Sequence, residues 1–163
     1  MDAQSNFKVT HSCNITSAQN CFDIYRAVVL PAQCDHNNHM NVRWYAYHFD
    51  EAGFQIWTVA NVRQSEMRER GVQVVVARTT IDYVKEMIAG TSILVRGGFT
   101  HVGSKSVVHC TKMFNADTGD LCAVQETVEV FFDPATRKSA PMPDDFNERL
   151  SALVIDASGI TPL

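Results

Sequence analysis

The sequence predicts an α+β domain in which an antiparallel sheet packs around one long central helix. Two observations predict this class: a helical apolar stripe over residues 42–60, and four segments rich in β-branched and aromatic residues over 71–133. A chain of 163 residues suits one domain with one core. We expect this domain to span residues 20–155, with an irregular arm over 1–19 and a tail over 156–163.

The first strand is predicted over Phe22–Leu30. Its sequence, FDIYRAVVL, combines alternating apolar and polar residues with a β-branched run. Pro31 follows, and it has no amide proton to donate to a neighbouring strand, so we expect the strand to end there.

The central helix is predicted from apolar residues that recur at steps of three or four. Its length of about 20 residues, at about 1.5 Å per residue, gives about 30 Å, enough to run the length of a small sheet. The residues that form this stripe are Val42, Tyr45, Phe49, Ala52, Gly53, Ile56 and Ala60.

Four strands are predicted to follow the helix, separated by turn signals. The turns fall at residues 89–90, 103–105 and 115–120. The four strand segments are 71–84, 91–102, 106–116 and 121–133.

A short terminal helix is predicted near the carboxyl end. The prolines and acidic residues of 141–145 supply a breaker and caps. Leu150, Leu153 and Val154 would then lie on one side of this helix. No internal repeat or linker supports a second domain.

Charge and hydropathy exclude several function classes. The formal net charge is -4, and the basic residues are scattered, so nucleic acid is not expected as a partner. No apolar run approaches the roughly 18 to 20 residues of a membrane-spanning helix. The amino-terminal residues lack the apolar region of a signal peptide, and we expect a cytoplasmic protein without a membrane partner.

The segment 34–41, CDHNNHMN, concentrates the groups that can carry chemistry. It places carboxylate, imidazole and amide side chains between a strand end and a helix start. The first turn of a helix has unpaired amide protons and the positive end of the helix dipole, so it can stabilise negative charge on an oxygen. A carboxylate and an oxyanion site could therefore face the same bound carbonyl.

This segment resembles the hotdog-fold thioesterases similar to 4-hydroxybenzoyl-CoA thioesterase. In that family a strand leads into Asp, three residues, His, then Asn and Tyr, followed by a long helix with an acidic pair. The residues in those places here are Asp35, His39, Asn41, Tyr45 and the pair Asp50–Glu51. The resemblance spans roughly Phe22 to Leu150, because the ending KSAPMPDDFNERL is also similar.

The resemblance implies a hotdog fold and hydrolysis of a small or medium acyl-CoA thioester. Asp35 would either attack the thioester carbonyl or activate a water that does so, and the sequence leaves both routes open. A backbone amide near Asn41 and Val42 would polarise the carbonyl oxygen, while His39 and Asn41 position groups around the acid. CoA is then part of the substrate, and no cofactor is expected.

The resemblance also implies substrate contacts. Asn38 and Tyr45 would lie at the substrate. Ser104 and Lys105 would touch a CoA phosphate, although a solvated hairpin tip is favoured for that pair. Asn38 stands where the family has glycine before the histidine. Asparagine tolerates the left-handed backbone region nearly as well, so we expect the turn to survive.

Some of these residues could also serve other roles. Cys34, His36 and His39 are possible zinc ligands, but their spacing is poor and no second ligand cluster accompanies them, so no metal is expected. Glu51 is an alternative catalytic carboxylate, because some hotdog thioesterases carry the acid on the central helix; a structural role is favoured.

Several functional questions stay open from the sequence. A homodimer or homotetramer is expected, because a single curved sheet leaves edges and a groove for partners to complete. The alternatives are a non-catalytic acyl-CoA binding or sensing module on the same fold, and hydration or dehydration of an acyl chain. Aromatic, short, branched and cationic acyl groups all remain possible.

Overall fold

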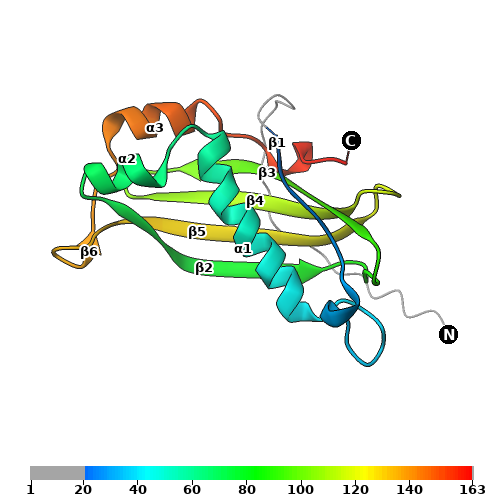
Figure 1. Ribbon diagram of the computed structural model, residues 1–163. Coiled ribbons are helices and arrows are strands. Elements are labelled where there is room, and N and C mark those ends of the chain that lie inside the picture. Colours follow the sequence, from blue (N-terminus) through cyan, green and yellow to red (C-terminus); the bar gives the residue numbers. More distant parts are fainter. Residues whose placement is uncertain (1–20, 163) are drawn as a thin grey trace.

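One long helix, α1, lies across the inner face of a curled antiparallel sheet (Figure 1). The computed structural model describes residues 21–162, so the arm predicted over 1–19 lies outside the described residues. The helices and strands are β1 (Phe22–Val28), α1 (Val42–Val59), α2 (Gln64–Glu69), β2 (Gln73–Tyr83), β3 (Ser92–Val102), β4 (Ser106–Asn115), β5 (Leu121–Asp133), β6 (Lys138–Ser139) and α3 (Asp144–Ser151), with 3-10 turns at Pro31–Gln33 and Ala157–Gly159.

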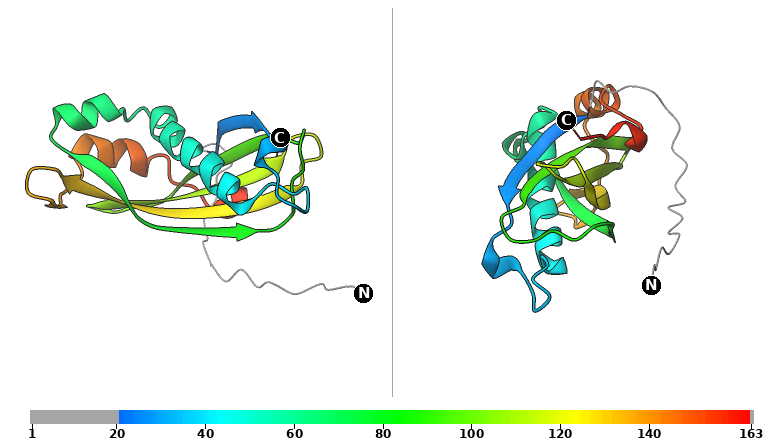
Figure 2. Two further views of the ribbon diagram at one scale, coloured as in Figure 1. Left: turned by 60° about the horizontal axis from the view of Figure 1, so that its bottom comes forward. Right: turned by 90° about the vertical axis from the view of Figure 1, so that its right-hand side faces the viewer.

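The sheet has the strand order β1-β3-β4-β5-β2, with β6 paired to β5, and all pairings are antiparallel. Figure 2 shows the sheet curling around α1, with α2 and α3 together at one end. This arrangement confirms the predicted α+β hotdog fold. β2 is an edge strand, and β5 is its only neighbour among the described strands.

The predicted helix is confirmed. It begins at Val42 because Asn41 caps it: the Asn41 side-chain oxygen accepts a hydrogen bond from the Arg43 amide at 3.2 Å. The apolar stripe packs against the sheet, with Phe49, Ala52 and Ile56 fully buried. Val42 departs from the predicted stripe, because it is 57% exposed at the helix start.

The four strands after the helix are confirmed, and β1 is shorter than predicted. It ends at Val28, and Pro31 begins a 3-10 turn. The predicted terminal helix forms as α3, but it ends at Ser151, so Leu153 and Val154 lie beyond it. The sequence pattern did not predict α2, which has only six residues.

β5 turns its more polar face toward the interior. Gln125, Thr127 and Glu129 are buried on the side that faces α1, whereas the residues between them are only half-buried on the outer side. A row of three buried polar side chains is unusual beneath a helix, because burial of a polar group costs free energy unless it is hydrogen-bonded. Two residues of this row, Gln125 and Glu129, line hollows beside α1.

The outer face of the sheet carries a second, smaller apolar cluster. Ile155 and Ile160 cover Leu94, Cys110 and Phe114 there. Hydrogen bonds hold the segment 155–160 at both ends. The Ile155 amide donates to the Phe99 carbonyl at 2.8 Å, and Lys112 Nζ donates to the Ile160 carbonyl at 3.1 Å. The predicted boundary at residue 155 stays a prediction.

Candidate active site

The loop between β1 and α1 is fixed by backbone hydrogen bonds at both ends. The Asn41 amide donates to the Gln33 carbonyl at 2.9 Å, and the Met40 amide donates to the Met87 carbonyl at 2.7 Å. His39 also forms an isolated β-bridge with Ile88. The segment that the sequence singled out is therefore an ordered turn held against residues 87–88.

Asp35 lies in this turn and is half-buried. Its Oδ1 accepts hydrogen bonds from the amides of Asn37 at 2.8 Å and His39 at 3.3 Å. None of the described residues donates a hydrogen bond to its other oxygen, Oδ2. The carboxylate is thus held by one oxygen, and the other oxygen is available to act on a bound molecule.

Asn38 closes the turn in a left-handed backbone conformation. Its φ is 62°, and its amide donates to the Asp35 carbonyl at 3.0 Å. This confirms that the turn survives with asparagine in place of the family's glycine, since asparagine tolerates this region better than most side chains. The Asn38 side chain is exposed.

The start of α1 supplies an unpaired backbone donor. The first amides of a helix have no intrahelical acceptor, and Asn41 satisfies the amide of Arg43 rather than that of Val42. Among the described residues, none accepts a hydrogen bond from the Val42 amide. The positive end of the helix dipole adds to its affinity for negative charge.

Asp35 and Val42 line the same hollow, which has a volume of about 330 Å³. The sequence predicted part of the lining of this hollow. The sequence carried no signal for residues 84–86, which follow β2 and also line the hollow. The residues that line the hollow are Asp35, His39, Met40, Val42, Tyr45, Tyr83, Val84, Lys85 and Glu86.

Tyr45 lines this hollow but uses its hydroxyl to hold the opposite wall. The hydroxyl donates to the Lys85 carbonyl at 3.3 Å and accepts from the Met87 amide at 3.1 Å. Burial raises the pKa of Tyr45 to about 12, so it stays neutral near pH 7. Its ring packs edge-on against Tyr83, with centroids 5.3 Å apart.

Ser104 and Lys105 do not reach this hollow within one chain. They form the β3–β4 turn, where the Ser104 carbonyl accepts from Met142 and the Lys105 carbonyl accepts from Phe131. The hollow lies at the other end of the sheet. The ten residues of β4, at about 3.3 Å each, separate the two ends by about 33 Å.

Glu51 is half-buried on α1 and does not line the hollow. Over residues 21–162, no group of three or more His, Cys, Asp or Glu side chains is placed to hold a metal ion. In the same part of the chain, no helix is long and apolar enough to cross a membrane.

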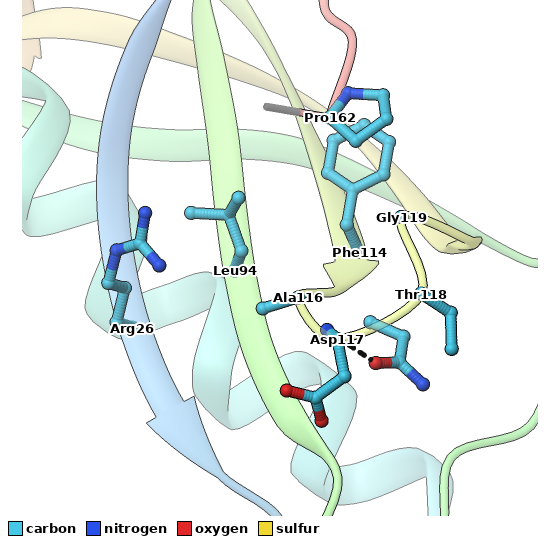
Figure 3. A pocket seen from close by; sticks show the side chains of 9 residues that line it. Arg26, Leu94, Phe114, Ala116, Asp117, Thr118, Gly119 and Pro162 are labelled. Carbon is cyan, nitrogen blue, oxygen red and sulfur yellow. Dashed lines mark hydrogen bonds between the residues drawn. The ribbon is translucent and has the colours of Figure 1, made fainter.

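A second hollow, of about 240 Å³, lies at the β4–β5 turn (Figure 3). Figure 3 shows Leu94, Phe114 and Pro162 around it, with Arg26 and Asp117 at its sides. Arg26 is already ion-paired to Asp23 at 3.1 Å. This hollow contains none of the residues that the sequence predicted as functional.

A curled antiparallel sheet around one helix is the architecture of the hotdog-fold thioester hydrolases. The chain belongs to the Thioesterase-like superfamily, whose family model matches residues 29–150. It is therefore a thioester hydrolase, as the sequence predicted. No curated protein sequence matches the chain significantly.

Solved structures with the same fold include enzymes that act on CoA thioesters. A 1,4-dihydroxy-2-naphthoyl-CoA thioesterase from Synechocystis has 18% identity and a TM-score of 0.70, over 80% of this chain and 96% of its own. The gentisyl-coenzyme A thioesterase BH1999 has 15% identity and a TM-score of 0.67, over 78% and 99%. The protein SAV2348 from Staphylococcus aureus, in complex with CoA, has 17% identity and a TM-score of 0.73, over 85% of each chain.

Proposed function

We propose that the protein hydrolyses a small or medium acyl-CoA thioester to the free acid and CoA. Asp35 acts as the nucleophile or general base, and the Val42 amide stabilises the oxyanion. The observation that carries this proposal is that Asp35 and Val42 line one hollow, and that among the described residues neither Asp35 Oδ2 nor the Val42 amide has a hydrogen-bond partner. Acyl transfer needs this pair of groups, one to deliver or activate the attacking oxygen and one to hold the charge that develops on the carbonyl oxygen.

Two routes use the same geometry. In one, Asp35 Oδ2 attacks the carbonyl carbon, CoA leaves as the thiolate, and water then hydrolyses the mixed anhydride. In the other, Asp35 removes a proton from water, and the resulting hydroxide attacks the carbonyl carbon. Both routes end in a carboxylic acid and a free thiol without a cofactor.

The other groups of the turn have positioning roles. The His39 amide and the Asn37 amide hold Asp35 Oδ1, and Asn41 sets the first turn of the helix whose amide faces the carbonyl. Tyr45 fixes the opposite wall through residues 85–87. Asn38 contributes its backbone conformation, which closes the turn, and its side chain is exposed.

A homodimer or homotetramer completes the site in this proposal. β2 is an edge strand whose outer side pairs with none of the described strands, and Val75 and Val76 on it are 43% and 57% exposed. A second copy that pairs along this edge would run antiparallel to the first. Its own Ser104 and Lys105 would then lie toward the first copy's Asp35, where they could contact the phosphates of the same CoA.

The test is thiol release from a panel of acyl-CoA esters, with Asp35→Asn compared with native protein. We expect the variant to lose roughly a hundredfold or more in kcat, as for removal of a catalytic base or nucleophile. Asp117→Asn is the matched control, because Asp117 is an exposed turn residue outside the hollow. It should keep native activity.

Two results would overturn the proposal. If the native protein releases no thiol from any ester but binds CoA derivatives, it is a non-catalytic binding module. If it changes a double bond of the acyl chain without releasing thiol, the chemistry is hydration or dehydration. Retention of native activity by Asp35→Asn would remove Asp35 from the mechanism.

A further inference from the structure

The hollow at Asp35 is the first in a row of three hollows along the seam between α1 and β2, and we call this row the groove. Two more hollows follow it, of about 460 Å³ and about 190 Å³, and these two share Asp50 and Val76. The groove walls are one stripe of α1 (Val42, Arg43, Ala46, Asp50, Gly53, Phe54 and Trp57) and one face of β2 (Tyr83, Ile81, Thr79, Val76 and Val74).

The length of the groove follows from the helix. Asp50 lies eight residues after Val42, which is about 12 Å along the axis at 1.5 Å per residue. Trp57 lies seven residues further on, or about 10 Å more. An acyl group whose carbonyl sits at the Val42 amide would therefore extend along this groove toward Asp50, and a longer one toward Trp57.

The floor of the groove is the buried polar row of β5. Gln125 lines the middle part and Glu129 the far part, and they are only 6% and 7% exposed. The Gln125 side-chain oxygen accepts from the Thr111 hydroxyl at 3.3 Å, while its amide nitrogen has no partner among the described residues. This buried donor therefore faces a groove that begins at the catalytic carboxylate.

The far end of the groove presents a hydrogen-bond acceptor. Glu129 Oε2 accepts from the Trp57 indole N–H at 2.7 Å. Glu129 Oε1 accepts no hydrogen bond from the residues that the structure describes, and His109 Nε2 lies 3.5 Å from it. Asp50 adds a second carboxylate at the rim, and no lysine or arginine of the described part of the chain lines this end of the groove.

We propose that the groove holds the acyl chain and that Glu129, assisted by Asp50, accepts a hydrogen bond from a hydroxyl or amino group near the chain's distal end. This inference rests on the proposed thioester hydrolysis and names its substrate class. An acyl chain that ends in a plain alkyl group would exclude water from the buried Glu129 carboxylate. It would not replace the hydrogen bond that water gives to this carboxylate, so its binding there costs free energy. A site built around a hydrogen bond rejects the analogue that lacks it more strongly than an apolar pocket rejects a change of size.

The test compares acyl-CoA esters of equal chain length that end in a methyl, a hydroxyl or an amino group. We expect a kcat/KM for the hydroxyl or amino ester that exceeds the methyl ester by roughly tenfold to a hundredfold, the range for a hydrogen bond to a charged group. Glu129→Gln and Asp50→Asn should both reduce this ratio. Asp50 is exposed, so its variant tests the idea even if Glu129→Gln does not fold.

Glu126→Gln is the matched control, because Glu126 lies on the same strand but faces outward, where it pairs with Arg78 at 3.0 Å. It should keep the native ratio. The preference of the hydroxyl ester over the amino ester, or the reverse, distinguishes a neutral donor from an ammonium group.

A binding measurement separates this inference from the proposed function. Non-hydrolysable thioether analogues with the same three chain ends are titrated into Asp35→Asn. If the donor-bearing analogues bind more tightly and Glu129→Gln removes the difference, the inference stands even if no ester is hydrolysed. If esters are hydrolysed without preference for a donor, or if the preference survives Glu129→Gln, the inference fails while thioester hydrolysis stands.

Discussion

Replacement of Tyr45 by phenylalanine should destabilise the protein and loosen the wall opposite Asp35. The substitution keeps the ring in the core, where the residue is 4% exposed. It removes the hydroxyl that donates to the Lys85 carbonyl and accepts from the Met87 amide. The change therefore isolates two hydrogen bonds from the packing of the ring.

The magnitude follows from the two lost partners. The Lys85 carbonyl belongs to an exposed residue and can accept a hydrogen bond from water instead. Loss of the hydrogen bond from the Tyr45 hydroxyl to this carbonyl therefore costs little. The Met87 amide is buried and has no other acceptor among residues 21–162, so it would be left unsatisfied. A buried, unsatisfied donor costs about 1–3 kcal/mol, and we expect Tyr45→Phe to lower the free energy of unfolding by that amount.

The assay is urea unfolding followed by circular dichroism at matched protein concentration. Tyr83→Phe is the control, because Tyr83 is 51% exposed and packs against the same ring. It should change stability by less than about 0.5 kcal/mol, as is usual for surface substitutions. A Tyr45→Phe protein as stable as the native one would refute the argument that the hydroxyl holds residues 85–87.

The pH dependence gives a second check on the same substitution. Burial raises the pKa of Tyr45 from 10.0 to about 12, so the unfolded chain loses this proton at a lower pH than the folded chain. The stabilisation is fully present below pH 10 and is lost as the pH rises toward 12. The advantage of native protein over Tyr45→Phe should therefore shrink across that window, because phenylalanine does not titrate.

Three further predictions concern other positions. Asn38→Ala should cost about 1–2 kcal/mol in urea unfolding because alanine resists the left-handed region, whereas Asn38→Gly should not; equal stability of all three proteins would show that the positive φ is no constraint. Gly97→Ala should cost about 1–3 kcal/mol, because the new Cβ would meet the Cys110 carbonyl oxygen and lie 2.7 Å from Thr111 Cγ2; an unchanged urea midpoint would contradict this. Burial lowers the pKa of His48 below 6.5, so stability should fall as the pH drops from 6.5, and His48→Gln should flatten this dependence in unfolding curves measured down to about pH 5; an equal slope in both proteins would exclude His48 as its source.

Much of the fold could be predicted from the sequence because its elements have strong local signals. The stripe from Val42 to Ala60 repeats at the helical period over five turns, and the β-branched runs after it are bounded by turn residues. The helix α2 had no such signal, since six residues are too few to show a period. The sequence also carried no signal for the cover that Ile155 and Ile160 form on the outer sheet face, because this cover depends on contacts with distant strands.

The candidate site, like the fold, has one part that the sequence predicted and one part that it did not. Asp35, Asn41 and Val42 follow one another closely in the chain, so a family pattern could place them together. The groove beyond them joins α1, β2 and β5, and alternation along β5 does not say which of its faces points inward. The valine-rich face would have been the natural choice for the core, yet the face with Gln125 and Glu129 occupies it.

The apolar cover on the outer sheet face has a consequence for synthesis. All strands of the sheet, up to Ser139, emerge from the ribosome before the cover does, because the cover comes from residues 155–160. Leu94, Cys110 and Phe114 therefore remain uncovered while the sheet itself can already form. During this interval the nascent chain exposes an apolar surface. Chaperones or a second nascent chain could bind this surface before residues 155–160 cover it.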